Sequence, residues 1–391
     1  MFRDTVLHVT VIAVLCSRGF VGALRALSNY HEYGNHAGVG AHRVWWVSGT
    51  GMMTRALRIE KENVTRFHDV PLGAPGEGEV RVSVRHVGLC GSDLNTFRGL
   101  NPLVQLPRIP GHEIGGEIVA AGPGVSADYA VGKRVIVMPY TSCGKCASCR
   151  KGRVNACRYN RTLGVQQDGG LAEEINVPAE KLILNETLAP RHLALVEPLS
   201  VGFHAVGRGR VTADDTVAVI GCGMIGMGVL IGAVARGARV IAIDPSEEKR
   251  SLAMRFGAAH VLPAGGEEVV AEINRLTGDD GVDVAFEAVG LPATFTQAVD
   301  LAGFSGRVVY VGYSKTPVTY QTQFFNLKEL DIMGSRNATL DDFHAVIEHL
   351  ETIGAAADAL ISRVFPFDEA EAALPYWDGD RDVLKIIVER A

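Results

Sequence analysis

Four of the seven cysteines in this 391-residue chain lie close together, in the segment VMPYTSCGKCASCRKGRVNACRYN. Their spacing is C-x2-C-x2-C-x7-C, and they are Cys143, Cys146, Cys149 and Cys157. Four thiolates on one loop can meet at a point without regular secondary structure, as a closed tetrahedral Zn²⁺ site requires. Two disulfides are the alternative, but a C-x2-C pair closes a strained small ring, and the cysteine density is not that of a disulfide-stapled protein. The spacing therefore predicts a structural zinc ion.

A second set of residues has the composition of an open metal site. Cys90 lies in GLCGSD, His112 and Glu113 lie in IPGHEIGGEI, and Glu197 lies in LALVEPLSVGFHA. A thiolate, an imidazole and a carboxylate supply three ligands and leave a fourth position for water or substrate. Each residue alone has an ordinary explanation, such as a buried cysteine or a glutamate in a turn. Their joint occurrence near the cysteine loop favours a catalytic zinc ion, with either Glu113 or Glu197 as the carboxylate ligand.

A glycine motif indicates a dinucleotide site. Gly221, Gly223 and Gly226 have G-x-G-x-x-G spacing, between the strand-like TVAVIG and the helix-like GMIGMGVLIGAVARG. The first glycine permits a tight turn, the second lets the backbone approach a pyrophosphate, and the third lets helix and strand pack closely. The helix N-terminus adds free N–H groups and positive partial charge. The alternative, a glycine-rich packing site without a ligand, does not explain the full context.

Asp244 indicates which dinucleotide binds. It ends the next strand-like segment, ARVIAIDP, eighteen residues past Gly226 (244 − 226). A carboxylate at this place suits the ribose hydroxyls of NAD and repels the 2′-phosphate of NADP. Pro245 and Ser246 follow it and offer no arginine for that phosphate. We therefore expect NAD.

The elements expected to position these residues fall into two regions with different sequence patterns. From residue 53 to about 197, alternating segments such as EVRVSVRHVGLC and frequent Gly and Pro predict strands and turns. From about residue 212, strands alternate with helices, one of them beginning near Ser246, which predicts a doubly wound parallel sheet. This alternation of strands and helices ends around residues 332–338, where a helix and final strands follow, including RDVLKIIVER.

Length and composition limit the possible functions. The chain has room for two domains, is 47% hydrophobic and 21% charged, and carries a net charge of −6 without a long basic run. A nucleic-acid partner is therefore not expected. Seven cysteines in a chain of this length favour a reducing cytoplasm.

Residues 1–51 lack a sustained period, and we expect them to lie outside the fold. Their apolar stretch, residues 6–16, is too short to span a bilayer, so no membrane association is expected. It only loosely resembles a signal peptide, because Asp4 stands in what should be a basic flank. The alternatives are a loose extension or a start assigned too far upstream, with Met52 or Met53 as the natural first residue.

With these motifs in place, the chain resembles the zinc-dependent medium-chain dehydrogenase/reductase family, and within it the polyol (sorbitol-type) and sugar-acid branch. GLCGSD, PGHEIGGEIVAAG, the cysteine loop, EPLSVGFHA, GCGMIG and GSRNAT occur in the family's order between residues 53 and 391. The resemblance implies a β-rich GroES-like catalytic domain, residues 52–198 and 337–391. It also implies a Rossmann NAD-binding domain, residues 199–336, and an active site in the cleft.

The resemblance also implies the roles of individual residues. Cys90, His112 and Glu113 match the ligands of a catalytic zinc ion, and Glu197 matches a position that holds a zinc-bound water or exchanges as a ligand. Ser92 matches the first group of a proton relay, while Asp93 is expected to be structural. Cofactor contacts are expected from Gly221, Gly223, Met224, Ile225, Gly226, Asp244, Val289, Gly312 and Tyr313.

The implied reaction is NAD-linked oxidation of a secondary alcohol of a polyol or sugar acid, or the reverse, with two zinc ions per chain. Arg336 in GSRNAT, and Asn95 and Arg98 in DLNTFRGLNP, are candidate substrate contacts. An L-threonine 3-dehydrogenase-like enzyme, a simple alcohol dehydrogenase and a non-catalytic zinc- and nucleotide-binding relative are the alternatives. A homodimer or homotetramer is expected from the resemblance.

Overall fold

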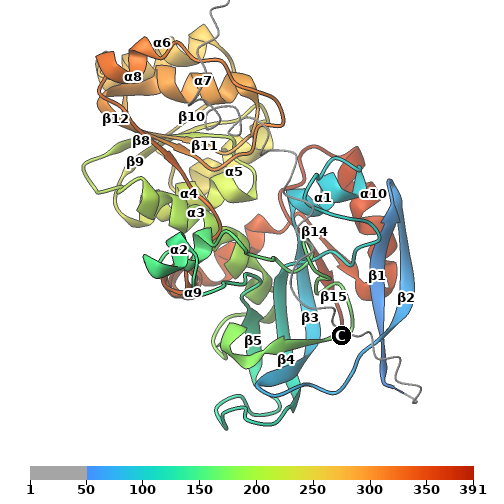
Figure 1. The fold of residues 1–391 in the computed structure, drawn as a ribbon. Coiled ribbons are helices and arrows are strands. Elements are labelled where there is room, and N and C mark those ends of the chain that lie inside the picture. The colour runs from blue at the N-terminus through green and yellow to red at the C-terminus, as the bar shows by residue number, and fades with distance from the viewer. Residues whose placement is uncertain (1–50) are drawn as a thin grey trace, which may run out of the picture. The chain divides into compact units, whose positions relative to one another are not determined.

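The computed structural model describes residues 51–391 of the chain (Figure 1). The expectations for the N-terminal extension concern residues 1–50, which lie outside the described residues, together with Gly51. The first element, β1 (Met53–Lys61), begins two residues after Gly51 and pairs with β2 (Val64–Pro71) in an antiparallel hairpin.

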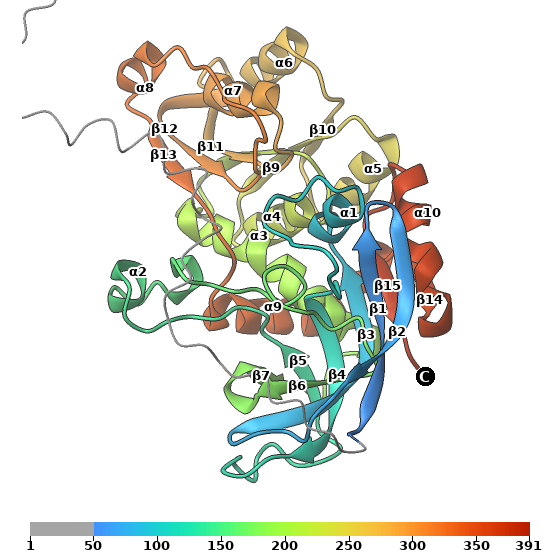
Figure 2. The same cartoon turned by 45° about the vertical axis from the view of Figure 1, so that its right-hand side comes forward.

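The larger β-rich sheet is assembled from both ends of the described chain. Its strand order is β14-β15-β3-β4-β5-β7, with β6 paired to β3. Figures 1 and 2 show the C-terminal strands β14 and β15 beside the blue β3, and β15 pairs with β3 antiparallel. The strands are β3 (Glu79–Leu89), β4 (Glu113–Ala121), β5 (Arg134–Val137), β6 (Glu174–Pro178), β7 (Leu182–Leu184), β14 (Arg363–Pro366) and β15 (Ile386–Glu389).

Short helices connect these strands. They are α1 (Gly91–Phe97), α2 (Ala147–Arg150) and α10 (Ala373–Gly379), with 3₁₀ turns η1 (Val154–Ala156), η2 (Ala179–Lys181), η3 (Pro190–Leu195), η4 (Gly354–Leu360) and η5 (Phe367–Ala372). Together with the sheet they form the expected β-rich GroES-like part.

The second sheet has six parallel strands in the order β10-β9-β8-β11-β12-β13. The strands are β8 (Thr216–Ile220), β9 (Arg239–Ile243), β10 (His260–Leu262), β11 (Val282–Glu287), β12 (Ala302–Tyr310) and β13 (Asp331–Gly334). The order reverses between β8 and β11, and a ligand of such a sheet binds outside the carboxyl ends of the strands at this switch point. The predicted Rossmann-type doubly wound sheet is confirmed.

Helices cover both faces of this sheet, because buried side chains alternate along its strands. Val217 and Val219 of β8 join one core cluster, and Ala218 and Ile220 join another. The helices are α4 (Met224–Ala235), α5 (Glu247–Arg255), α6 (Glu267–Thr277), α7 (Pro292–Leu301) and α8 (Gln323–Leu327). Ser246 caps α5, as predicted, since its hydroxyl accepts a hydrogen bond from the Lys249 N–H at 3.3 Å.

Two further helices lie where the sheets meet, α3 (Val196–Arg208) and α9 (Leu340–Ile353). A Cβ on Gly202 of α3 would lie 2.3 Å from the carbonyl carbon of Gly228 in α4, so these helices touch backbone to backbone. Phe343 of α9 is fully buried in a core cluster that also contains Ile136 of β5. The two sheets therefore share one core, and the division at residues 198/199 and 336/337 stays a prediction.

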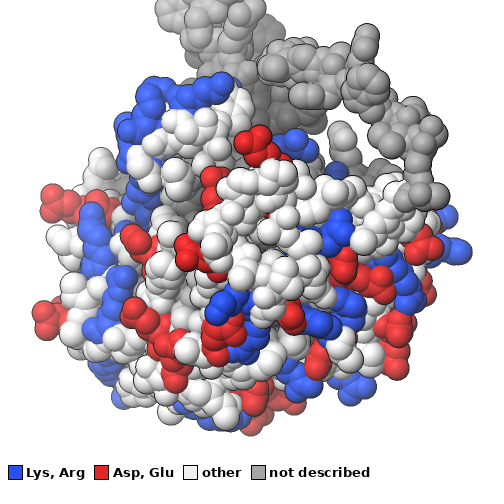
Figure 3. Space-filling model, turned by 90° about the horizontal axis from the view of Figure 1, so that it is seen from below, with Lys and Arg blue, Asp and Glu red and all other residues white. Residues whose placement is uncertain are grey.

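Helix length and surface charge of the described residues bear on membrane and nucleic-acid partners. No helix within residues 51–391 has the length and apolar character needed to cross a bilayer. On the face in Figure 3, basic and acidic side chains are interspersed over most of the surface.

Candidate active site

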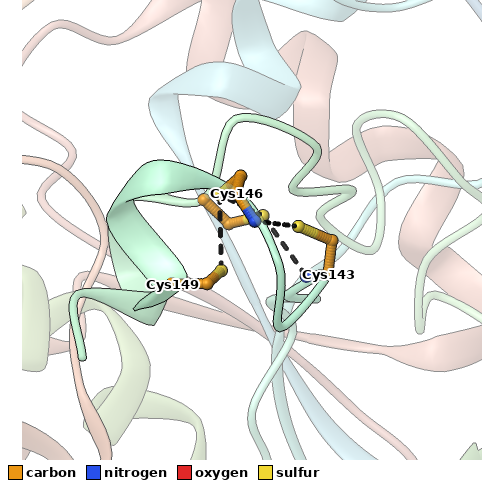
Figure 4. Close-up of side chains that lie close together, drawn as sticks. Cys143, Cys146 and Cys149 are labelled. Atoms are coloured by element: carbon orange, nitrogen blue, oxygen red, sulfur yellow. Dashed lines mark hydrogen bonds between the residues drawn. The ribbon is translucent and has the colours of Figure 1, made fainter. Parts of the chain in front are cut away.

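The four cysteines of the loop converge. One sulfur from each of Cys143, Cys146, Cys149 and Cys157 lies within 4.8 Å of the other three. The Cys146 sulfur is 3.5 Å from that of Cys149 and 3.8 Å from that of Cys157, far longer than the roughly 2.05 Å of a disulfide. Figure 4 shows Cys143, Cys146 and Cys149 directed toward one another from the loop and the start of α2. The set is that of free thiols, not of two disulfides.

Backbone amides donate to the sulfurs of Cys143 and Cys157, which favours their thiolate forms, whereas burial raises the pKa of Cys149 to about 11. The Cys143 N–H donates to the Cys157 sulfur and the Cys146 N–H donates to the Cys143 sulfur, both at 3.3 Å. The Ser148 hydroxyl and backbone N–H groups lower the pKa of Cys146 to about 5. Four sulfurs with this donor environment fit a tetrahedral zinc ion, as the spacing predicts.

The second predicted set also comes together, in part. Ligand atoms of Cys90, His112 and Glu113 lie within 4.8 Å of one another. Cys90 follows β3, and His112 directly precedes β4, whose first residue is Glu113. The register of these antiparallel strands pairs Gly88 with Glu113 and so brings the end of β3 to the start of β4.

Gly88 is a functional residue that the sequence analysis missed. A Cβ at this position would lie 2.0 Å from Oε2 of Glu113, so no other residue leaves room for the Glu113 carboxylate. A glycine inside an otherwise regular strand is the signal that could have revealed it, since such glycines often mark a close approach.

Lys385 was missed as well. Its Nζ lies 2.6 Å from Oε1 and 2.5 Å from Oε2 of Glu113, and it also donates to the Leu89 carbonyl at 2.8 Å. Both side chains are only 1% exposed. Lys385 therefore compensates the Glu113 charge inside the protein, while each carboxylate oxygen keeps lone pairs for a metal ion.

Glu197 lies beside this cluster but is held differently. It stands in the first turn of α3, is buried, and accepts a hydrogen bond from the Tyr140 hydroxyl. Burial raises the pKa of Glu197 to about 7; the charge of Glu113 adds to the rise and that of His112 opposes it. Of the two carboxylates considered for the metal, Glu113 is the one that the structure groups with Cys90 and His112.

The turn after Cys90 carries Ser92 and Asp93. The Asp93 carboxylate accepts hydrogen bonds from the N–H groups of Cys90 at 2.9 Å and Gly111 at 3.3 Å, so it ties together the two segments that supply the cluster. This matches the structural role expected for Asp93. The Ser92 hydroxyl is buried and has no hydrogen-bond partner among the described residues, and its place in a proton relay stays a prediction.

The glycine motif has the expected local geometry. Gly221 has φ +92°, and a Cβ on Gly226 would lie 1.7 Å from the Gly221 carbonyl oxygen. A Cβ on Gly223, which caps α4, would meet nothing within 4 Å, so the space beside it is open to a ligand. Both oxygens of Asp244 accept backbone hydrogen bonds, from Cys222 at 2.7 Å and Ser246 at 2.8 Å.

The other predicted cofactor residues lie at a cavity beside the parallel sheet, at the start of α4, or after the end of β12. A cavity of about 800 Å³ outside the ends of β8 and β9 is lined by Gly221, Pro245 and Val289, among others. Met224 and Ile225 begin α4. Gly312 packs against the buried carboxylate of Glu287, and Tyr313 is 73% exposed.

The three candidate substrate residues all contact other residues of the chain. Arg98 donates to the Asp378 carboxylate and so joins α1 to α10. Asn95 accepts a hydrogen bond from Lys315 at 3.2 Å. Arg336 is exposed, and its carbonyl accepts a hydrogen bond from the Asn155 side chain at 2.8 Å. Their contact with a substrate stays a prediction.

Comparison with known proteins gives consistent matches. The family model for the alcohol dehydrogenase GroES-like domain matches residues 76–187, and that for zinc-binding dehydrogenase matches residues 225–352. A zinc-type alcohol dehydrogenase-like protein of Haemophilus influenzae is 35% identical over 81% of this chain and 92% of its own length. L-galactonate-5-dehydrogenase of Escherichia coli K12 is 34% identical over 83% of this chain and 93% of its own. The crystal structure of the alcohol dehydrogenase RspB from E. coli CFT073 with NADH superposes with a TM-score of 0.80 at 32% identity, covering 87% of this chain and all of that one.

We expect Lys385→Met to lower the free energy of unfolding by about 3–5 kcal/mol, because removing one partner of a buried ion pair leaves an uncompensated charge on Glu113. The loss should shrink in Lys385→Met/Glu113→Gln, where no unpaired charge stays buried. Urea unfolding followed by circular dichroism measures both, with Lys61→Met at an exposed lysine as the matched control. Equal losses in the single and double variants would contradict this account of the pair.

Proposed function

The chain belongs to the zinc-dependent medium-chain dehydrogenase family, and from that premise we propose that it oxidises a secondary alcohol of a polyol or sugar acid to the ketone with NAD, or catalyses the reverse. It is an oxidoreductase of the zinc-type alcohol dehydrogenase class. The observation that carries the proposal is the cluster of Cys90, His112 and Glu113 next to a buried, unpartnered Ser92 hydroxyl. The likeness to an enzyme of L-galactonate supports a sugar acid.

The donor set at the cluster fits a catalytic zinc ion, with one thiolate, one imidazole and one carboxylate. When bound there, zinc would supply Lewis acidity toward the substrate hydroxyl. Ser92 would accept the proton of that hydroxyl and at the same time give up its own hydroxyl proton to the next group of the relay, while the bound nicotinamide would accept a hydride from the same carbon. Proton and hydride together account for the two hydrogens that the alcohol loses.

A panel of polyols, aldonates including L-galactonate, L-threonine and simple alcohols tests the activity through NADH fluorescence. We expect turnover with polyols or aldonates in protein shown to carry two zinc ions per chain. Cys90→Ala should lower kcat/KM by about 10³-fold or more, because a Lewis acid contributes several kcal/mol, while NAD binding survives.

Activity of Cys90→Ala equal to that of the wild type would refute the catalytic zinc site. No turnover with any member of the panel, in protein that carries both zinc ions, would instead favour a non-catalytic zinc- and nucleotide-binding protein.

The cofactor preference rests on Asp244. We expect Asp244→Asn to weaken NAD binding by about 10- to 100-fold, because hydrogen bonds to a charged group are worth about 1.5–3 kcal/mol, and to improve NADP binding relative to NAD. Titration of both cofactors by calorimetry measures this. Asp283→Asn is the control, since Asp283 also accepts a backbone hydrogen bond, from Thr216, but away from the cofactor loop. An unchanged ratio of the two affinities would remove Asp244 from cofactor selection.

We propose further that the protein is a homodimer, or a tetramer built from such dimers, joined along β13. Among residues 51–391 this edge strand pairs only with β12, and Ile332 on it is 40% exposed. An open strand edge with an exposed apolar side chain is a template for pairing with a second copy.

Replacement Ile332→Lys should weaken self-association about tenfold or more, because two like charges would face each other across the two-fold axis. Sedimentation equilibrium measures the dissociation constant. Leu340→Lys, at an exposed leucine outside the sheet, is the control. Identical association of the Ile332→Lys variant and the wild type would exclude this interface.

A cytoplasmic location fits the proposal. The cysteines within residues 51–391 are all free thiols, and the loop site needs its four sulfurs reduced.

A further inference from the structure

Tyr140 is a buried tyrosine that no role assigned above explains. It lies between β5 and the cysteine loop, is only 7% exposed, and donates its hydroxyl hydrogen to Oε1 of Glu197. Its ring meets Phe343 of α9 edge-on, with centroids 6.4 Å apart and an interplanar angle of 80°. Because Phe343 is fully buried, the ring has little freedom, and the hydroxyl is fixed in place.

The two carboxylates near the cluster are balanced by different means. Glu113 has a full counter-charge, Lys385, on both of its oxygens. Glu197 is 4% exposed and forms no ion pair with any residue between 51 and 391. Its hydrogen bond comes from an uncharged donor, the Tyr140 hydroxyl, which supplies no counter-charge.

We propose that Tyr140 is a positioning residue that holds the Glu197 carboxylate away from the catalytic metal, and thereby keeps the fourth ligand position for the substrate. This inference rests on the proposed zinc-dependent function. A buried carboxylate without a donor pays a large desolvation cost and turns to the nearest positive charge. Without the Tyr140 hydroxyl, that charge would be a metal ion held by Cys90, His112 and Glu113.

The same contact explains why two carboxylates occur at one site. Glu113 is confined by Gly88 and Lys385, which leave it beside Cys90 and His112. Glu197 comes from a different element, α3, and its direction depends on a hydroxyl from a third segment. The identity of the fourth ligand of a metal held there would therefore depend on a single hydrogen bond, that from Tyr140 to Glu197.

The test compares the wild type, Tyr140→Phe and Tyr140→Phe/Glu197→Gln with cobalt in the catalytic site. The visible absorption of Co²⁺ reports its ligands and geometry, so replacement of a bound water by a carboxylate shifts the bands. Tyr140→Phe keeps the ring against Phe343, and unchanged NAD affinity would verify the fold. Tyr159→Phe, at an exposed tyrosine in the cysteine loop, is the matched control.

We expect Tyr140→Phe to show a shifted spectrum, because a carboxylate would replace water as the fourth ligand. We also expect a slower loss of cobalt to a chelator and kcat/KM reduced about 10- to 100-fold, the value of one hydrogen bond to a charged group. The double variant should regain the wild-type spectrum, because an amide is a poor ligand.

Two results would overturn the inference: a wild-type spectrum in Tyr140→Phe with reduced activity, which would place the hydroxyl on the substrate, or a wild-type spectrum with unchanged activity. Failure of the proposed function looks different, since the wild type would then show no turnover with any member of the substrate panel, whatever the cobalt spectra of the variants.

Discussion

The antiparallel pairing of β3 with β4 is the constraint on which the candidate active site depends. It sets Gly88 opposite Glu113, and so brings Cys90, after the end of β3, to His112 and Glu113 at the start of β4. A shift of one residue in this register would turn Glu113 to the other face of the sheet. The absent side chain at Gly88 is part of the same constraint, because the Glu113 carboxylate fills that space.

The two metal-ligand sets are built on different principles. The cysteine loop brings its four sulfurs together within one short segment, with backbone amides as donors to sulfur. The Cys90 cluster needs two strands, and its charge balance needs Lys385 from the far end of the chain. The first set is thus a local property of the loop, whereas the second exists only in the completed sheet.

This difference explains what the sequence could predict. The cysteine spacing, the glycine motif and the Ser246 cap are local patterns, and the structure shows the expected local geometry at each. The alternation of strands and helices likewise predicted the doubly wound sheet. Lys385 is 272 residues from Glu113, and nothing in the pattern around it distinguishes it from other lysines.

Tyr140 and Arg98 show the same limit. The contact of Tyr140 with Glu197 joins residues 57 apart, through elements whose packing is decided by the shared core. The guanidinium of Arg98 pairs with Asp378 because α1 packs beside α10, a contact that the sequence around Arg98 does not indicate; its contact with a substrate stays a prediction. Side-chain direction is decided by neighbours that are remote in the sequence.

The backbone contact of α3 with α4 has a mechanical consequence. Glu197 lies at the start of α3 and Gly223 at the start of α4, so the second carboxylate and the nucleotide loop belong to two helices in direct contact. The residues of the Cys90 cluster lie on strands β3 and β4 of the other sheet, or next to them. Any displacement of these two helices relative to the β-rich sheet would therefore move Glu197 and the nucleotide loop together.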